Sequence, residues 1–307
     1  MRRTPRHDWF GLTAFQPGAR RTGDGAVLYL LERVDSTSDF LLGRGEGGMG
    51  RVCEWDGWGW RAEPQRALSP PPAAPAGSVA VARRQTQGRG RMGRGWTSLD
   101  GLMMSWLVPP VPARGVTGLA VWAGLIAATV LREEFGLPVD LKWPNDLSVD
   151  GRKLGGLLLD AVRSPRGPLL VAGLGLNLGA TSATLPLELR GKATSFRMVR
   201  GRHPLPGTVA GAMLARFDAE LPGFRADGWS PWLRRFAACD ALRGRVVSIA
   251  THGGEWRGRA VGIDETGALL LRRVDGRIMR VLAGDAHVTG VAAPVAGRRN
   301  PGARSAG

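Results

Sequence analysis

Short apolar runs bounded by glycine, proline or polar residues recur along this chain, and each predicts a β-strand. Two such runs, 147–149 and 152–162, flank Asp150-Gly151, a dipeptide that favours the tight turn of a hairpin. The other predicted strands are 26–34 (AVLYLLERV), 78–82 (SVAVA), 101–109 (GLMMSWLVP) and 168–179 (PLLVAGLGLNLG).

Other segments predict helices. Residues 35–42 (DSTSDFLL) begin with Asp35 or Ser36 as the N-cap, whose side-chain oxygen can accept a backbone N–H of the first turn. Residues 113–135 predict a long apolar helix that ends at Gly136. Two further helices are expected near 206–221 and 229–238.

The same patterns divide the chain into segments. Residues 1–25 are polar and rich in Arg and Gly, which predicts a flexible arm, and residues 293–307 predict a disordered tail. The main domain, 26–240, contains a Gly-, Trp- and Pro-rich stretch at 43–77 without periodicity, which predicts a mobile insertion loop. Residues 241–292 change to short strands and turns, typical of a small barrel-like β domain.

The composition indicates a globular protein of 307 residues, 43% hydrophobic and 22% charged. Its net charge of +16 first suggests nucleic-acid binding, because Lys and Arg neutralise phosphates. However, only three of the 42 basic residues are lysines (Lys142, Lys153 and Lys192), and the arginines are spread over the whole chain. A general basic bias is therefore favoured over a nucleic-acid surface, and no specific DNA binding is expected.

Several other classes of protein are disfavoured by simple counts. Cys53 and Cys239 are too few for a disulfide framework or a metal cluster, and the four histidines lack ligand spacing. The N-terminus has no apolar run typical of a secretory signal, and the longest apolar stretch, 116–131, is too short for a membrane span. We expect a cytoplasmic protein without membrane contact.

Residues 88–96 (GRGRMGRGW) contain a G-x-G-x-x-G pattern. In a dinucleotide-binding fold this loop leads into a helix, but here residues 97–108 predict a turn and a strand. The G-K-[ST] of a P-loop is also missing. Since guanidinium groups pair with phosphate oxygens and an indole can stack on a base, the predicted ligand is a nucleoside phosphate. A nucleic-acid-binding Arg/Gly segment is the alternative.

Further motifs make the prediction more specific. LKWPND (141–146) places charged and amide side chains around a Trp-Pro step, RKLGGLLLD (152–160) carries Lys153 beside a glycine pair, and AGLGLNLG (172–179) ends a strand on Asn177. Each motif alone is weak evidence, because an ordinary turn, a solvated lysine or a strand exit would look the same. Together and in this order they are specific.

With these motifs, the sequence resembles biotin protein ligases. The resemblance rests on the stretches DSTS (35–38), QTQGRGRMGRGW (85–96), KWPND (142–146), KLGG (153–156) and GLGLNL (173–178), and it covers roughly residues 30–290. It implies an α+β fold: a mixed β-sheet with packed helices, as in the class II synthetase-like catalytic domain of biotin and lipoate ligases, followed by a small SH3-like β-barrel.

The resemblance also implies site residues. Those expected to bind biotin are Ser36, Thr37, Ser38, Gln85, Arg89, Gly90, Arg91, Lys153, Gly156 and Gly173. Those expected near ATP or the adenylate are Arg91, Arg94, Trp96, Asn145, Asp146 and Asn177. Lys153 and Arg91 are the expected catalytic cations, and Mg²⁺ is expected near Asp146. Ser38 stands where many members of the family have Asn.

The implied activity is ATP-dependent conversion of biotin to biotinyl-5′-AMP, followed by transfer of biotin to a lysine of a biotin carboxyl carrier protein of acetyl-CoA or a related carboxylase. No helix-turn-helix domain precedes Ala26, so repressor activity is not expected. The sequence leaves open whether the protein forms a homodimer. The alternatives are a lipoate ligase or octanoyl transferase, against which KWPND and the arginine loop argue, and a non-enzymatic nucleic-acid-binding protein.

Overall fold

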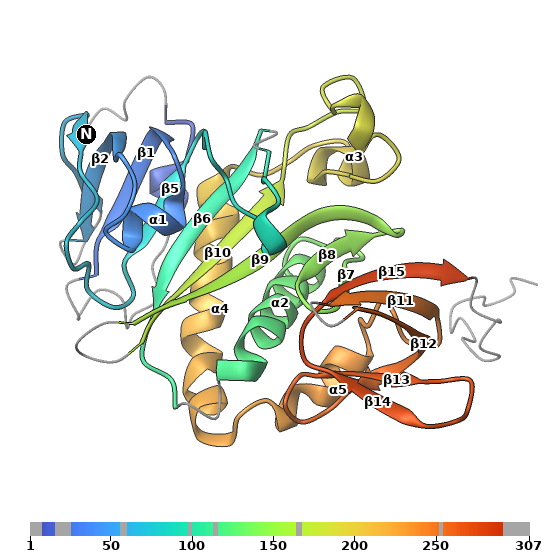
Figure 1. Cartoon of the computed structure of the whole chain (residues 1–307). Coiled ribbons are helices and arrows are strands. Elements are labelled where there is room, and N and C mark those ends of the chain that lie inside the picture. The colour runs from blue at the N-terminus through green and yellow to red at the C-terminus, as the bar shows by residue number, and fades with distance from the viewer. Residues whose placement is uncertain are drawn as a thin grey trace, which may run out of the picture.

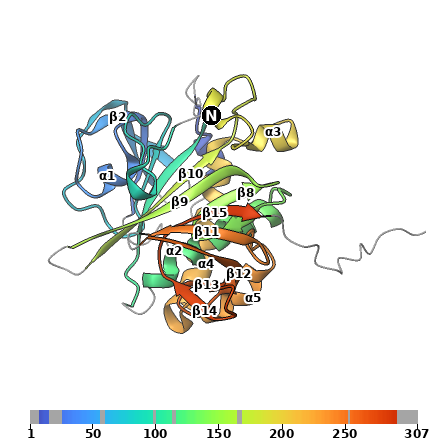
Figure 2. The same ribbon diagram turned by 45° about the vertical axis from the view of Figure 1, so that its right-hand side comes forward.

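A computed structural model of the chain describes residues 8–15, 26–55, 60–97, 100–112, 116–163, 168–251 and 254–290. They form a large mixed sheet covered by helices and a smaller antiparallel sheet beside it (Figures 1 and 2). The strands of the large sheet are β1 (Leu28–Val34), β2 (Gly48–Trp55), β3 (Trp60–Ala62), β4 (Arg66–Leu68), β5 (Val79–Ala82), β6 (Gly101–Val108), β7 (Asp140–Lys142), β8 (Asp146–Val149), β9 (Arg152–Val162) and β10 (Leu169–Asn177).

The strand order of the large sheet is β3-β2-β1-β5-β6-β10-β9-β8-β7, with β4 also paired to β2. The β1–β5 pair is parallel, and the other pairs in this sheet are antiparallel. A mixed sheet was predicted, and this prediction is confirmed. The hairpin prediction is also confirmed, because β8 and β9 pair across Asp150 and Gly151, both of which have positive φ.

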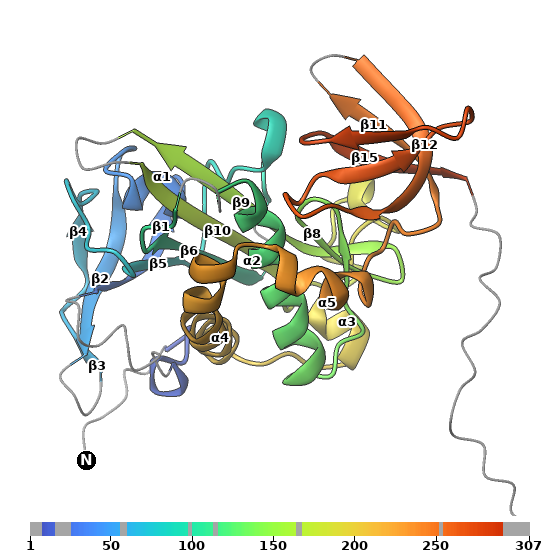
Figure 3. The same cartoon turned by 90° about the horizontal axis from the view of Figure 1, so that it is seen from below.

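The helices are α1 (Thr37–Leu41), α2 (Val116–Glu133), α3 (Phe196–Arg200), α4 (Pro206–Asp227) and α5 (Leu233–Ala237). Figure 3 shows α2 and α4 together on one side of the large sheet. Trp122 of α2 packs against Phe217 and Phe224 of α4, and Phe217 also meets Trp106 of β6, with ring centroids 4.6 Å apart. This aromatic layer forms the centre of the core. None of the helices within the described residues has the length and apolarity needed to cross a membrane.

The second sheet contains β11 (Val246–Thr251), β12 (Gly254–Ile263), β13 (Leu269–Arg272), β14 (Ile278–Val281) and β15 (Asp285–Gly290). Its order is β14-β13-β12-β11-β15, and every pair is antiparallel. The prediction of a small all-β unit is confirmed. Its ladder is open rather than a closed barrel, because among the described residues β14 and β15 are the two edges and do not pair with each other.

Residues 8–15 are not a flexible arm, so this part of the prediction for 1–25 is wrong. Phe10 and Phe15 are 0% and 1% exposed and belong to the main core. Their rings lie 5.3 Å apart, and Phe15 continues the contact to Trp60. The Asp8 carboxylate accepts hydrogen bonds from the backbone of the next turn, which fixes the segment. Residues 1–7 and 16–25 lie outside the described part of the chain, as do 291–307.

The prediction of a mobile loop over 43–77 is also wrong, because this stretch contains β2, β3 and β4. Its glycines suggested a loop, yet Gly48 and Gly50 lie within β2. A Cβ atom on Gly50 would come within 2.4 Å of the Leu30 carbonyl oxygen of β1. The pairing of β1 with β2 shifts register between Leu31 and Arg33, as a β-bulge does. The extra residue of the bulge, Glu32, lies in β1. Within β2 the buried residues Gly50 and Cys53 are three positions apart, so β2 lacks the alternation that would have predicted a strand.

We expect Phe10→Ala to lower the free energy of unfolding by about 3–5 kcal/mol, since it would empty a buried aromatic position. Thr13→Ala, at an exposed position of the same segment, should change it by less than about 0.5 kcal/mol. Urea denaturation followed by circular dichroism measures both. Equal stability of Phe10→Ala and the wild type would show that residues 8–15 are not part of the folded core.

Candidate active site

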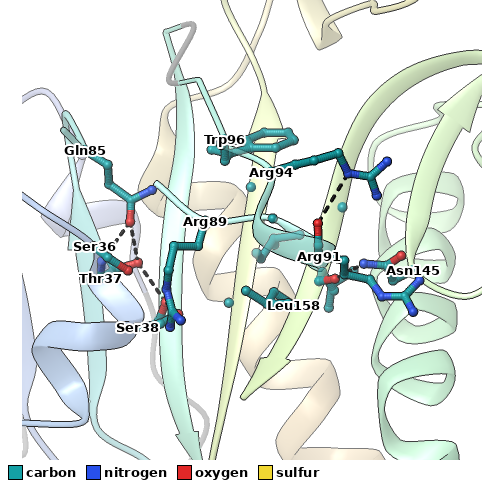
Figure 4. A pocket seen from close by; sticks show the side chains of 18 of the residues that line it. Ser36, Thr37, Ser38, Gln85, Arg89, Arg91, Arg94, Trp96, Asn145 and Leu158 are labelled. Atoms are coloured by element: carbon teal, nitrogen blue, oxygen red, sulfur yellow. Dashed lines mark hydrogen bonds between the residues drawn. The ribbon is translucent and has the colours of Figure 1, made fainter. Parts of the chain in front are cut away.

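A cavity lies on the face of the large sheet opposite α2 and α4. Ala172, Leu174 and Leu176 of β10 belong to the core that contains these helices. Because successive side chains of a strand point to opposite faces, Gly173 and Gly175 face the other side. Both line the cavity, together with residues of α1, β9 and the loop 85–96 (Figure 4).

The cavity brings together nearly every residue that the sequence predicted for binding. The predicted residues on its wall are Ser36, Thr37, Ser38, Gln85, Arg89, Gly90, Arg91, Arg94, Trp96, Asn145, Asp146, Lys153, Gly156 and Gly173. Asn177 does not line it: its side chain is buried, and its amide donates a hydrogen bond of 3.0 Å to the Thr194 carbonyl oxygen. Asn177 therefore ties the end of β10 to the segment that follows, outside the cavity.

One end of the cavity is a buried network of small polar groups. Ser36 is the N-cap of α1, and its hydroxyl oxygen accepts a hydrogen bond from the Asp39 N–H. The backbone N–H and the hydroxyl of Thr37 both donate to Gln85 Oε1, over 2.7 and 3.0 Å. Figure 4 shows these side chains clustered on the α1 side of the cavity. The cluster can recognise a polar ring that carries its own donors and acceptors.

Ser105 of β6 is a site residue that the sequence analysis missed. Its hydroxyl lies 2.7 Å from that of Thr37 and 2.9 Å from that of Ser38, so it joins the two residues that begin α1. Ser105 is only 1% exposed. The available signal was a single polar residue inside the otherwise apolar run GLMMSWLV, because a buried hydroxyl needs a partner.

The floor of the cavity requires glycine. A Cβ atom on Gly173 would lie 2.9 Å from Ser38 Oγ, and one on Gly175 would lie 2.4 Å from the Trp96 ring. The indole of Trp96 therefore lies directly against the backbone of β10. Lys153 Nζ is 5.7 Å from the centre of the same ring, within the range of a cation–π contact. A flat slot bounded by a strand, an indole and a cation suits a planar, anionic ligand.

The loop 85–96 folds as a short hairpin over this slot. The Gly90 N–H donates to the Arg94 carbonyl oxygen over 2.7 Å, and the Trp96 N–H donates to the Gly88 carbonyl oxygen over 2.8 Å. The turn between them contains Gly93 with a φ of 71°, a conformation that favours glycine. The glycine pattern thus builds a hairpin turn and not a strand-to-helix loop, which agrees with excluding a dinucleotide fold.

Arg91, Arg94 and Lys153 line the slot, and carboxylates compensate only part of their charge. Lys153 Nζ forms an ion pair with Asp146 Oδ1 at 2.7 Å. Arg94 pairs with Asp285 of β15, and Arg91 Nη1 donates to the Gly284 carbonyl oxygen over 3.0 Å. Burial lowers the pKa of Arg91, and it also lowers the pKa of the neighbouring Lys142. Such a site attracts polyanions.

Arg89 lies at the other end of the loop. Its guanidinium pairs with Asp39 of α1 at 3.0 Å and with Asp160 of β9 at 2.5 Å. Burial raises the pKa of Asp160, and Arg89 opposes that shift only in part. Figure 4 shows Arg89 extended toward Ser38, over the polar end of the cavity. The loop is therefore held across the cavity by charged groups from different elements.

Asp146 is the carboxylate on which a metal prediction depends. Mg²⁺ is commonly held by one or two carboxylates together with substrate phosphates. Within the described residues no group of three or more acidic, His or Cys side chains could hold a metal ion without a substrate. A single carboxylate beside the cationic slot fits a cation that arrives with phosphates.

Comparisons with known proteins agree with this geometry. The sequence matches the Biotin/lipoate A/B protein ligase family over residues 65–177 and the Biotin protein ligase C terminal domain over residues 244–288. These matches place it in the class of biotin and lipoate ligases. The fold is similar to that of biotin protein ligase from Aquifex aeolicus in complex with biotin and ATP, with a TM-score of 0.66, 27% identity, and coverage of 85% of this chain and 98% of that one.

Similarity to individual proteins shows which family within this class the chain belongs to. The chain is 30% identical to the biotin--[acetyl-CoA-carboxylase] ligase of Paracoccus denitrificans, over 69% of this chain and 90% of the relative. It is 33% identical to the Mycobacterium tuberculosis protein of the same name, over 68% and 78%. It is 31% identical to the bifunctional ligase/repressor BirA of Bacillus subtilis, over 69% of this chain, and spans 66% of that relative, just under two thirds. The chain belongs to the biotin protein ligase family.

We expect Ser105→Ala to lower the free energy of unfolding by about 1–2 kcal/mol, because the hydroxyls of Thr37 and Ser38 lose a buried partner. Ser182→Ala, at an exposed position, is the matched control and should leave stability unchanged. Both values come from urea denaturation. A Ser105→Ala protein as stable as this control would mean that the buried hydroxyl network does not hold α1 in place.

Proposed function

We propose that this protein is an ATP-dependent ligase that activates biotin as biotinyl-5′-AMP and transfers the biotinyl group to a lysine of a biotin carboxyl carrier protein. The observation that carries the proposal is the cavity itself, where a small polar network and a cationic slot adjoin over a glycine floor. A polar ring with an acidic tail and a nucleotide would fill these two parts. Relatives named as biotin ligases support biotin as that ring compound.

The first step joins two anions. The carboxylate of biotin attacks the α-phosphorus of ATP; a C–O–P bond forms and pyrophosphate leaves. Lys153 and Arg91 line the cavity in which this negative charge would gather, and preplaced cations lower such a barrier. Lys153 is held near the reacting groups by its pair with Asp146 and by its contact with Trp96.

Mg²⁺ would be held by Asp146 together with the phosphates and would neutralise part of their charge. Trp96 and Arg94 are proposed to contact the adenylate, because both line the slot. Asn145 lines it as well, and its amide donates to the Leu157 carbonyl oxygen of β9, which fixes its orientation. Asn177 would support β10 from outside the cavity.

The second step transfers the acyl group. The neutral amine of the carrier lysine attacks the acyl carbon of the mixed anhydride, an amide forms, a proton is released, and AMP leaves. No covalent bond to the enzyme is required. The hairpin 85–96 would exclude water from the anhydride while it waits for the carrier. Its backbone hydrogen bonds and its arginine contacts already hold it across the cavity.

The proposal extends to domain roles. Residues 26–240 would form the catalytic domain and residues 241–292 the C-terminal domain. The carrier would be the biotin domain of acetyl-CoA carboxylase or a related carboxylase. A cytoplasmic location stays a prediction, and homodimer formation is not part of the proposal.

Lipoate is the closest alternative substrate, because the matched family includes biotin and lipoate ligases. We expect purified protein to catalyse ATP–pyrophosphate exchange that depends on biotin and Mg²⁺, and to biotinylate one lysine of a carrier domain. Exchange with lipoate as the added acid is the comparison. Exchange with lipoate but not biotin would contradict the proposal, and binding of nucleic acid without any exchange would favour the non-enzymatic alternative.

We expect Lys153→Ala to slow biotin-dependent exchange by about 10²-fold or more, because it removes a cation from the developing charge. Lys192→Ala is the matched control: its side chain is exposed, and its backbone carbonyl oxygen accepts the hydrogen bond from the Lys153 N–H in both proteins. Circular dichroism should show that both variants are folded. Exchange by folded Lys153→Ala at the wild-type rate would remove this residue from the mechanism.

A further inference from the structure

The two loop arginines that face the nucleotide slot are both held by the C-terminal sheet. Arg91 donates to the Gly284 carbonyl oxygen, and Arg94 pairs with the Asp285 carboxylate. The partners are nearly two hundred residues apart in the sequence, with a separation of 193 for Arg91 and Gly284. Figure 4 shows Arg91 and Arg94 extending to the same side of the loop, away from Arg89. The C-terminal sheet thus contacts one end of the loop.

The two groups that make these contacts are rigidly placed. Asp285 begins β15 and pairs with Ala250 of β11. Gly284 is buried, and a Cβ atom there would lie 2.6 Å from Ile249 Cγ2. The sheet itself is attached to the large domain, because the Trp143 indole N–H donates to the Gly267 carbonyl oxygen over 2.9 Å in a buried position. A carbonyl and a carboxylate are therefore presented to the loop from a fixed support.

The charge state of Asp285 suits this contact. Burial raises its pKa, but the hydrogen bond and charge of Arg94, together with the positive charge of other neighbours such as Arg91, lower it by more, so that its pKa lies below the ordinary value. The same hydrogen bond raises the pKa of Arg94. Both groups are thus charged at neutral pH. The Asp285 side chain is 18% exposed, which limits screening of the pair by solvent.

We propose that Asp285 is a positioning residue that holds the loop 85–96 over the nucleotide slot before ATP binds; this rests on the function proposed above. A glycine-rich loop loses much conformational freedom when it orders over a ligand. Contacts that order it in advance remove that cost from ATP binding. Arg91 is held by an uncharged carbonyl oxygen, so its positive charge stays available for phosphate.

The opposite role for Asp285 would be that of a carboxylate that competes with phosphate for Arg94. The two roles predict opposite changes. Loss of an anchor weakens ATP binding and loosens the loop, whereas loss of a competitor strengthens ATP binding. The region around Arg94 contains more cations than carboxylates. Its other cations are Arg91, Lys142 and Lys153, whereas Asp146 is the one acid named there besides Asp285. This surplus of positive charge favours the anchor.

The test uses Asp285→Asn, with Asp275→Asn as a matched control. Asp275 lies in the exposed β13–β14 turn of the same sheet and accepts a hydrogen bond from the Arg277 N–H, a role that Asn can keep. Hydrogen exchange of the Gly90, Arg94 and Trp96 amides is measured without ligand. We expect about two- to fivefold faster exchange in Asp285→Asn, the range for a partly exposed ion pair, and no change in the control.

Steady-state kinetics tests the proposed role of Asp285 independently. The KM for ATP should rise about two- to fivefold in Asp285→Asn with a smaller change in kcat, and Asp285→Glu should restore part of the loss. Unchanged loop exchange, or a lower KM for ATP, would overturn the proposal. If Asp285→Asn does not fold, Arg94→Gln breaks the same pair from the loop side and must accelerate exchange of the Gly90 and Trp96 amides. The exchange experiment needs no ligase activity, so it separates failure of the anchor from failure of the proposed function.

Discussion

The close approach of Trp96 to the backbone of β10 is the constraint on which the site depends. Gly173 and Gly175 leave the middle of one face of β10 without side chains, and the indole lies against Gly175. The slot that remains is bounded by the loop above and the strand below. Any side chain at Gly175 would displace Trp96, and with it the ring against which Lys153 lies. The missing side chain at Gly175 thus sets the position of Trp96 and of Lys153, the proposed catalytic cation, beside it.

The second organising factor is charge. Arg89, Arg94 and Lys153 each lie against a carboxylate, and the partners come from α1, β8, β9 and β15. Exposed pairs of this kind add little to overall stability. Their effect here is local, because they keep a glycine-rich hairpin and its cations near the place where phosphates would bind. The polar network around Ser105 performs the corresponding task for the other half of the cavity.

Much of this arrangement could be predicted from the sequence, and the failures have physical causes. Regular apolar runs predicted β6 and β10 correctly, and Asp150-Gly151 predicted the hairpin that carries Lys153. The strands within 43–77 were missed because glycines occur within β2 and its buried residues do not alternate with exposed ones. The motif resemblance identified most residues of the cavity wall; Asn177, which it also named, lies outside that wall. Contacts between distant segments, such as Arg94 with Asp285, leave no local pattern and require the folded chain.

The central claim is that the cavity forms and retains an acyl-adenylate of biotin. Native mass spectrometry of the protein after incubation with biotin and MgATP tests it most directly, because a noncovalent adenylate adds a defined mass to the folded chain. We predict a complex whose added mass equals that of biotinyl-5′-AMP, which disappears when a carrier domain is added. A protein that acquires no such mass with biotin, or that acquires an adenylate only with lipoate, would contradict the account.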